Sequence, residues 1–285
     1  MTAIQSPLPL MYEEIVRRAL LEDLGRAGDL TTDAVVGSGA DAAARVVARR
    51  EGRLAGVGIA AAAFRQLDPA LALEQEICDG SDLEAGAEVL RLRGSARAIL
   101  SGERTALNLL GHLCGVATLT RSYVRAVAGS SARVVCTRKT TPGLRALEKY
   151  AVRCGGGANH RFGLDDAVLI KDNHLAVAGG VRAAVERVRS AVGHLVKIEL
   201  EVDTLEQLTA GLELEVDAVL LDNMDLATLR EAVLLVGGRC TTEASGGIDL
   251  GSAAAIAATG VDLLSVGALT HSAPWFDVSL EVEAD

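Results

Sequence analysis

The second half of this 285-residue chain repeats one pattern, which constrains the fold more than any other feature. From about residue 132, short apolar or β-branched runs recur, and a segment compatible with a helix follows each one. The runs cover residues 133–137, 167–170, 195–200, 218–221, 239–244 and 262–266. Strands that alternate with helices predict a parallel sheet, and near-continuous apolar strands predict burial on both faces. Six such units, or seven if a weak one is missed, fit a (β/α) barrel.

The first half lacks this regular alternation and predicts a separate mixed α/β layer. Residues 12–24 carry apolar side chains at helical spacing, and Gly25 ends that helix. Strand-like runs cover residues 44–49, 52–55, 71–77 and 88–93, with a helix expected over 56–66. The run 95–128 predicts two helices broken near Gly111 or Gly115. We therefore expect one domain over 1–115 and a barrel over 116–271, with a tail, 272–285, that can return to the first domain.

Composition narrows the class of protein. Apolar residues make up 49% and charged residues 23%, which is typical of a globular soluble chain. The uncharged run 263–276 is too short and too polar to span a membrane, and the first five residues lack signal-peptide character. The five cysteines are an odd number without a Cys-x-x-Cys pair, so reduced thiols in a cytoplasmic protein are expected.

Residues 138–174 form a basic island in an acidic protein. Seven cations and four carboxylates give this stretch a net charge of +3, whereas the whole chain carries −10. Such an island favours a site for a small anion, because a polyanion binder such as a nucleic-acid-binding protein is basic over a whole face. Arg145, Lys149 and Arg153 lie four residues apart on a predicted helix and fit ordinary surface. Arg138, Lys139, Arg161 and Lys171 instead cluster with Gly, Thr, Asn and His at segment ends.

Each predicted barrel strand is followed by a polar or glycine-rich group. These groups are, in strand order, Arg138 and Lys139; Lys171; Glu201; Asp222 and Asn223; Ser245, Gly246 and Gly247; and Gly267 and Ala268. The carboxyl ends of barrel strands converge at one mouth, where barrel enzymes place their sites. The glycines that follow the last two strands predict a phosphate site, since glycine lets backbone N–H groups approach phosphate oxygens.

The types of side chain suggest roles within that mouth. Arg138 and Arg161 suit bidentate contacts to carboxylates, and Lys139 and Lys171 suit point contacts to carboxylate or phosphate. Glu201 and Asp222 could hold Mg²⁺ or stabilise a developing positive charge on a sugar ring. Glu199 shares the face of Glu201 and could substitute for it or be structural. His160 could orient a substrate or cap a loop, and His174 is expected to anchor its loop.

Six ordered motifs resemble one enzyme family, the quinolinate phosphoribosyltransferases. They are Thr137–Gly143, Gly156–Arg161, Leu169–His174, Glu199–Val202, Leu221–Met224 and Glu243–Ile248. Residues 22–32 and 103–108 also resemble that family, so the resemblance covers nearly the full length.

The resemblance implies a fold and a reaction. The fold is an N-terminal α/β sandwich domain beside an incomplete (β/α) barrel with six or seven parallel strands. The reaction joins quinolinate to phosphoribosyl pyrophosphate (PRPP) with Mg²⁺, and gives nicotinate mononucleotide, pyrophosphate and CO₂ for NAD biosynthesis.

The resemblance also implies residue roles. Arg138, His160, Arg161 and Lys171 would bind the quinolinate carboxylates, with Lys139 close to both substrates. Glu201 and Asp222 would hold ribose and metal; Ser245, Gly246, Gly247, Gly267 and Ala268 would hold the 5′-phosphate; and Arg104 would reach the partner's site in a homodimer.

Three other functions stay open at this point. A related phosphoribosyltransferase of the same fold could use another aromatic acid or base. A Schiff-base aldolase could use Lys171 as its nucleophile, although it would not need so many cations. A non-catalytic anion-binding regulator would be weakened by Glu201 and Asp222 in its mouth.

Overall fold

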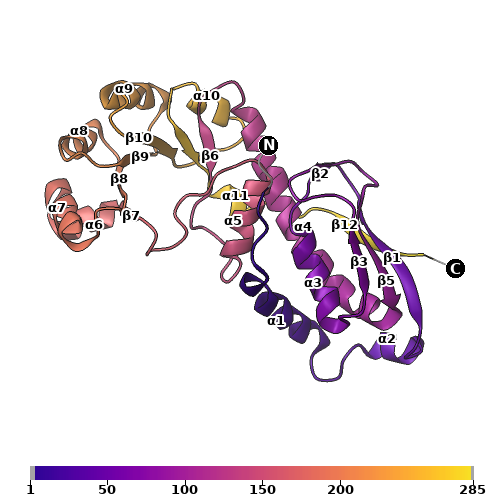
Figure 1. Ribbon diagram of the computed structural model, residues 1–285. Coiled ribbons are helices and arrows are strands. Elements are labelled where there is room, and N and C mark those ends of the chain that lie inside the picture. Colours follow the sequence, from indigo (N-terminus) through magenta and orange to yellow (C-terminus); the bar gives the residue numbers. More distant parts are fainter. Residues whose placement is uncertain (1–3, 284–285) are drawn as a thin grey trace. The chain divides into compact units, whose positions relative to one another are not determined.

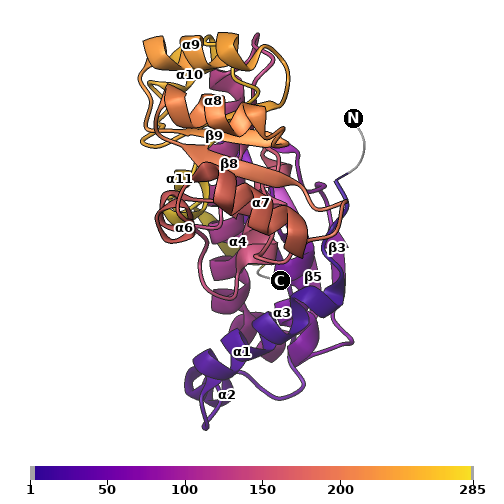
Figure 2. The ribbon, with the colours of Figure 1, turned by 90° about the vertical axis from the view of Figure 1, so that its left-hand side faces the viewer.

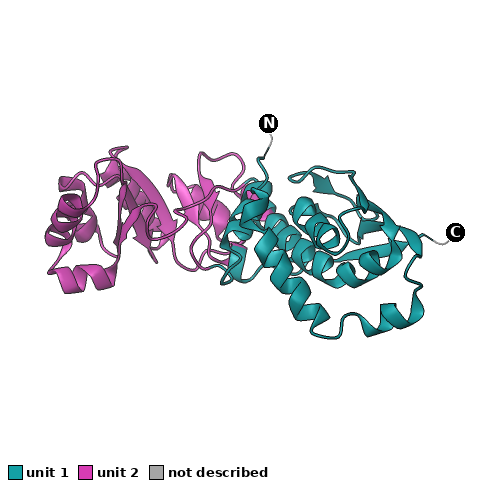
Figure 3. Cartoon of the chain, turned by 60° about the horizontal axis from the view of Figure 1, so that its bottom comes forward, with its two compact units in different colours: residues 1–121, 140–156, 270–285 teal, residues 122–139, 157–269 magenta. Residues whose placement is uncertain are grey.

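The protein is described by a computed structural model that covers residues 4–283 and forms two compact units (Figure 3). Unit 1 holds residues 4–121, 140–156 and 270–283, and unit 2 holds residues 122–139 and 157–269. The predicted domain boundary lies between residues 115 and 116, whereas the two compact units divide first between residues 121 and 122. The segment 140–156, which was expected in the barrel, belongs to unit 1. Residues 1–3 and 284–285, which the predicted domains include, lie outside the described residues.

Unit 1 is built on a four-stranded antiparallel sheet in the order β12-β1-β5-β3 (Figure 1). The elements are η1 (Pro9–Met11), α1 (Glu13–Leu24), α2 (Leu30–Val35), β1 (Asp41–Ala48), β2 (Gly52–Arg53), α3 (Val57–Leu67), β3 (Ala72–Gln75), β4 (Asp82–Leu83), β5 (Glu88–Ser95), α4 (Ala96–Ala126), α5 (Arg145–Cys154), α11 (Ala268–His271) and β12 (Val278–Val282), with α4 and α11 crossing into unit 2. The C-terminal strand returns to this sheet, where Leu280 pairs with Val46.

The first helix follows its sequence pattern. Val16 and Leu20 are buried, and the chain leaves the helix at Gly25 with a positive φ of 56°. Glycine adopts that conformation without steric cost, so Gly25 ends α1 as predicted.

The predicted break in the long helical run is wrong. α4 continues unbroken for 31 residues from Ala96 to Ala126. Gly111 and Gly115 serve close packing instead, because a Cβ on Gly111 would lie 2.8 Å from Trp275 and one on Gly115 would overlap the Pro274 carbonyl oxygen. The C-terminal segment needs these two gaps to cross the helix, so the glycines mark a contact rather than a turn.

Lys149, which its helical spacing had assigned to the surface, is buried instead. Lys149 is only 2% exposed, and Glu148 beside it is fully buried. Arg145 is half-buried and Arg153 is exposed, so the surface assignment fits only the outer positions of α5. Helical spacing alone could not reveal that the face carrying Lys149 packs inward.

Unit 2 is a six-stranded parallel sheet in the order β6-β11-β10-β9-β8-β7. The elements are β6 (Arg133–Val135), β7 (Val168–Ile170), α6 (Asp172–Ala178), α7 (Val181–Ala191), β8 (Ile198–Val202), α8 (Leu205–Glu213), β9 (Ala218–Asp222), α9 (Leu226–Val236), β10 (Thr241–Ser245), α10 (Ala253–Ala257) and β11 (Leu263–Ser265). Helices α7, α8 and α9 lie along the outside of the strands (Figures 1 and 2). β6 and β7 end the sheet, so the barrel is incomplete, and the predicted fold class is confirmed.

The third barrel strand begins later than predicted. It covers Ile198–Val202 rather than 195–200, so Glu201 lies inside the strand and is buried with Glu199 on the same face. The core is built from Ala, Val, Leu and Ile, and Cys114 and Cys136 lie in it, while none of the five cysteines forms a disulfide. Across residues 4–283, no helix has both the length and the apolar character that a membrane span requires.

Candidate active site at the barrel mouth

One cavity of about 510 Å³ lies at the carboxyl ends of the unit 2 strands. Its volume falls within the usual range for small-molecule sites. The lining residues all belong to unit 2; they are Thr137, Arg138, Lys139, His160, Arg161, Leu169, Lys171, Glu201, Leu220, Asp222, Asn223, Glu243, Ser245, Gly246, Gly247 and Ser265. The structure therefore brings together ten of the thirteen site residues predicted from the sequence.

Arg138 and Arg161 line this cavity as neighbouring positive charges. Burial lowers the pKa of Arg161, and the neighbouring charge of Arg138 lowers it further. Arg161 donates one N–H to the Ala167 carbonyl oxygen at 3.0 Å, whereas its buried Nε has no hydrogen-bond partner within residues 4–283. Like charges held together in a partly buried site favour an anionic ligand.

The two lysines occupy different settings. Lys171 forms an ion pair with Glu201 Oε2, which fixes its ammonium group inside the cavity. Lys139 is exposed, and its backbone N–H donates to Thr137 Oγ1 at 2.9 Å. His174 accepts a hydrogen bond from the Lys171 backbone N–H at 2.9 Å, so it anchors the start of α6 as expected.

A glycine turn follows β10 and faces the end of β9. Gly246 and Gly247 have φ values of 95° and 60°, which favour glycine. A Cβ on Gly246 would overlap Asn223 Oδ1, so only glycine fits there. The backbone N–H of Asn223 donates to the Ser245 carbonyl oxygen at 2.9 Å, and its side-chain amide lies 2.6 Å from Asp222 Oδ2. The turn, the amide and the carboxylate thus form one connected group.

A half-buried histidine and two buried glutamates form a cluster in the same barrel. His160 Nε2 is 2.8 Å from Glu199 Oε2 and 3.6 Å from Glu243 Oε1. The Arg161 backbone N–H donates to His160 Nδ1 at 2.8 Å. Burial raises the pKa of Glu243 to about 7, and the charge of Glu199 raises it while His160 opposes the shift.

Three predicted residues lie away from the cavity lining. Gly267 and Ala268 follow β11, but only Ser265 from that strand end reaches the lining. Arg104 lies on α4 in unit 1, with its side chain 66% exposed, and it does not line the unit 2 cavity.

Four polar lining residues were given no role from the sequence. Asn223 was named only as a group at the end of its strand, and Thr137 adjoins Arg138, so the ends of their strands could have indicated them. Glu243 lies two residues before Ser245 and shares its face of β10. Ser265 ends β11, and the same period of two applied to every strand would have found it and Glu243.

Two groups of side chains could bind a cation. His160, Glu199 and Glu243 place ligand atoms within 4.8 Å of one another. Glu201 and Asp222 offer oxygen ligands on neighbouring strands at the cavity. Oxygen atoms from one or two carboxylates match the preference of Mg²⁺, so the second pair fits that ion.

Comparisons with known proteins agree with this architecture. The family model for the quinolinate phosphoribosyl transferase N-terminal domain matches residues 29–114, and that for the C-terminal domain matches residues 116–281. The chain belongs to the quinolinate phosphoribosyl transferase family.

Individual relatives cover nearly the whole chain. A Bacillus subtilis protein named probable nicotinate-nucleotide pyrophosphorylase (carboxylating) is 44% identical over 96% of this chain and 94% of its own length. A Mycobacterium leprae protein named nicotinate-nucleotide pyrophosphorylase (carboxylating) is 45% identical over 94% and 96%. The solved structure of the Francisella tularensis nicotinate-nucleotide pyrophosphorylase has a TM-score of 0.94 at 37% identity, and covers 99% of this chain and all of that one.

Proposed function

We propose that this protein transfers the phosphoribosyl group of PRPP to quinolinate and releases pyrophosphate and CO₂, which leaves nicotinate mononucleotide. One observation carries the proposal: a single cavity gathers four cations, three carboxyl groups and a double-glycine turn. Two anionic reactants need cations to bring them together, and a sugar that gains positive charge needs carboxylates nearby. The names of the full-length relatives support the same reaction.

The cations account for the aromatic dicarboxylate. Arg138 and Arg161 grip carboxylates, and Lys171, fixed by Glu201, gives a point contact. Lys139 is exposed at the same cavity, where it contacts both reactants. These side chains mainly hold the dianion in place, and such positioning can account for several kcal/mol of a reaction barrier.

The far side of the cavity suits the phosphorylated sugar. Backbone N–H groups at Ser245, Gly246 and Gly247 contact the 5′-phosphate, because no side chain shields them in the glycine turn. Glu201 and Asp222 accept hydrogen bonds from the ribose hydroxyls and stabilise positive charge at C1. Asn223 holds Asp222 in place through its amide.

Mg²⁺ is part of this proposal, with Glu201 and Asp222 as its protein ligands. When bound, the ion supplies positive charge beside the pyrophosphate oxygens. Since Glu201 Oε2 is already paired with Lys171, its carboxylate serves both groups, and Asp222 is the more accessible ligand.

The bond changes then follow from the substrates. The pyridine nitrogen attacks C1 of the ribose, and the bond from C1 to pyrophosphate breaks. The quaternised nitrogen draws electrons into the ring, so the bond to the neighbouring carboxyl group breaks and CO₂ leaves. A proton replaces it on the ring carbon.

The assembly completes the proposal. Arg104 is exposed on unit 1 and, in line with the family resemblance, contacts the cavity of a partner chain in a homodimer. Cysteines that form no disulfide suit a reducing compartment such as the cytoplasm.

Incubation of the protein with quinolinate, PRPP and Mg²⁺ tests the reaction. Nicotinate mononucleotide should form together with one equivalent of CO₂, measured with quinolinate labelled in its 2-carboxylate. Replacement of quinolinate by nicotinate is the matched control, because it lacks that carboxylate and should react far more slowly. Faster reaction with nicotinate would favour the related transferase instead.

A further inference from the structure

Asn223 follows strand β9 in a backbone conformation that few residue types adopt. Its φ is 53°, and Glu215 is the other non-glycine residue with a positive φ among residues 4–283. Asparagine tolerates this left-handed conformation better than most residues, because its short polar side chain can form local hydrogen bonds. Strained backbone of this kind gathers at functional sites, and Asn223 lines the cavity.

The left-handed turn brings two adjacent side chains together. In an extended strand, neighbouring side chains point to opposite faces, so those of Asp222 and Asn223 would not meet. The turn reverses that direction, and Asn223 Nδ2–H donates to Asp222 Oδ2 at 2.6 Å. A hydrogen bond to a carboxylate is stronger than one between neutral groups, so it fixes the orientation of Asp222 and leaves Oδ1 to meet a ligand.

The backbone of Asn223 acts on the glycine turn. Asp222 and Ser245 form the last pair between β9 and β10, and the next N–H, that of Asn223, donates to the Ser245 carbonyl oxygen at 2.9 Å. The carbonyl and the following N–H of a trans peptide point in opposite directions, so this bond directs the Gly246 N–H away from Asn223. The bond thereby orients the first peptide of the turn proposed for the 5′-phosphate.

Gly246 provides the space that the amide occupies. A Cβ at Gly246 would overlap Asn223 Oδ1 and would lie 2.6 Å from Asn223 Cγ. The amide therefore lies against the Gly246 backbone on one side and is bonded to Asp222 on the other. These three residues form one continuous contact across the carboxyl ends of β9 and β10.

We infer that Asn223 is a positioning residue that fixes both parts of the PRPP site. Its side-chain amide orients the Asp222 carboxylate, and its backbone N–H orients the turn at Gly246. This inference rests on the proposed function, in which Asp222 meets the ribose and the turn meets the 5′-phosphate. Removal of the side chain alone should disturb the carboxylate and spare the turn, because the backbone N–H remains.

Asn223→Gly separates the two parts, since glycine keeps the left-handed backbone and its N–H but has no amide. Isothermal titration calorimetry should show about tenfold weaker binding of PRPP, because a hydrogen bond to a charged group is lost. The affinity for inorganic phosphate, followed by NMR, should change less than about twofold, because the turn keeps its backbone bond. Unchanged PRPP affinity would overturn the inference, as would an equal loss for inorganic phosphate.

Asn223→Asp supplies a second arm that keeps the size of the side chain and its tolerance of the left-handed conformation. It replaces the N–H donor by a negative charge beside Asp222, so PRPP should bind about 100-fold more weakly. PRPP affinity equal to that of the wild type in this variant would show that the N–H is not needed, and would overturn the role of the amide.

A double-mutant cycle tests whether the amide acts through Asp222. In an Asp222→Ala background, Asn223→Gly should weaken PRPP binding less than about twofold, because coupled residues are non-additive. Losses that multiply would contradict that link. Glu215→Gly is the matched control, since Glu215 has a φ of 51°, is exposed and does not line the cavity. Its PRPP affinity should equal that of the wild type.

NMR of the side-chain amides in the ligand-free protein tests the geometry without PRPP. The Asn223 signal, identified by its absence in Asn223→Gly, should lie downfield, as a hydrogen bond to a carboxylate predicts, and should move upfield in Asp222→Ala. A signal that does not move would overturn the inference. Absence of nicotinate mononucleotide formation by the wild-type protein would instead refute the proposed function, while the amide signal would still report on the hydrogen bond itself.

Discussion

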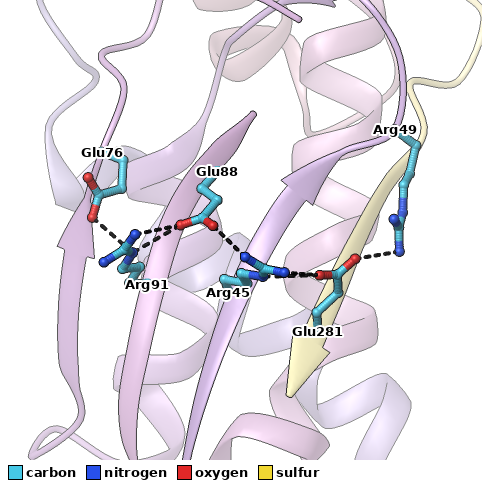
Figure 4. A network of polar contacts seen from close by, with 6 residues as sticks. All are labelled: Arg45, Arg49, Glu76, Glu88, Arg91 and Glu281. Atoms are coloured by element: carbon cyan, nitrogen blue, oxygen red, sulfur yellow. Dashed lines mark hydrogen bonds and ion pairs between the residues drawn. The ribbon is translucent and has the colours of Figure 1, made fainter. Parts of the chain in front are cut away.

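The chain uses arginine and glutamate in two opposite ways. Across the sheet of unit 1, cations and anions alternate in a row (Figure 4). Arg45 lies between Glu88 at 2.6 Å and Glu281 at 2.9 Å, while Arg91 lies between Glu88 at 2.8 Å and Glu76 at 3.3 Å. Hydrogen bonds from Arg91 and Arg45 lower the pKa of Glu88. Every charge in this row has an opposite neighbour within the protein.

At the barrel mouth, Lys171 is paired with Glu201, but other like charges are neighbours. Burial and then the charge of Arg138 lower the pKa of Arg161, and burial and then the charge of Glu199 raise the pKa of Glu243. Such an arrangement is unfavourable for the protein alone, whereas the row on the sheet is already satisfied. The binding site therefore differs from the structural network in whether each charge has an opposite charge beside it within the protein, and not in how many charges it contains.

The largest expected effect comes from removing a cation at the mouth. Lys139→Ala and Arg161→Ala should each lower kcat/KM for quinolinate about 100-fold, because a contact to a charged group is lost. Arg145→Ala is the matched control, since Arg145 donates to Thr140 Oγ1 and does not line the cavity. Steady-state kinetics measures all three, and equal losses would contradict the proposed site.

Arg104 is a cation that belongs neither to the row of charges on the unit 1 sheet nor to the lining of the cavity. Arg104→Ala and Lys139→Ala should each be nearly inactive alone if Arg104 serves the partner's cavity. Mixing them with subunit exchange should restore about a quarter of wild-type activity, since half of the dimers are mixed and each holds one intact site. Activity that stays at the level of the separate variants, although the subunits exchange, would contradict the role of Arg104 in the partner's cavity.

The glycine turn tests a part of the mouth that carries no charge. Gly246→Ala forces a Cβ into Asn223 Oδ1 at a φ of 95°. We expect the KM for PRPP to rise about tenfold or more, consistent with about 1–3 kcal/mol of backbone strain. Gly247→Ala has open space around its Cβ and should cost less. Isothermal titration calorimetry measures the affinity of each variant for PRPP, and weaker binding by Gly247→Ala than by Gly246→Ala would contradict this prediction.

The pH dependence of stability sharpens the contrast between the two carboxylate settings. The pKa of Glu243 is raised to about 7 in the folded protein, above its usual value of about 4.3 in the unfolded chain. Its contribution is complete below pH 4.3, falls as pH rises toward 7, and then levels off, because only the unfolded chain ionises within that window. Denaturant unfolding from pH 5 to 8 should show this loss in the wild type and a flatter curve in Glu243→Gln. Parallel curves would contradict the shift.

The smallest effect belongs to the row of charges on the sheet. Arg91→Met removes the contacts to Glu76 and Glu88, but both lie at a solvent-exposed surface. The melting temperature should change by a few degrees at most, because exposed ion pairs contribute little, and kcat/KM should not change. Calorimetry and kinetics check this together, and a loss of activity would show that the row serves the reaction.

Several features could be predicted from sequence alone because they depend on local order. The strand and helix periods predict the barrel units, Gly25 marks the end of α1, and the strand ends supply most residues of the mouth. Parallel strands bring their carboxyl ends to one edge whatever the details of packing. That geometric rule is why the order of residues along the chain is enough to group Arg138, Lys171, Glu201 and Ser245.

Other features were decided by contacts between distant segments. Gly111 and Gly115 look like helix breakers in the sequence, but the C-terminal segment packs against them and α4 stays continuous. Lys149 looks like surface until the burial of α5 is known. From the sequence, His160 could equally orient a substrate or cap a loop. In the fold, its Nε2 lies beside Glu199 Oε2, and its Nδ1 accepts a hydrogen bond from the Arg161 backbone N–H.

The sequence by itself determined most of the barrel strands and the helices between them, and which chemical groups end each strand, since these follow from local periodicity. Only the tertiary structure decided which charges meet a partner and which are left facing a like charge. The reason is physical: the pKa and the hydrogen-bond state of a group depend on neighbours within a few ångströms, and those neighbours come from distant parts of the chain.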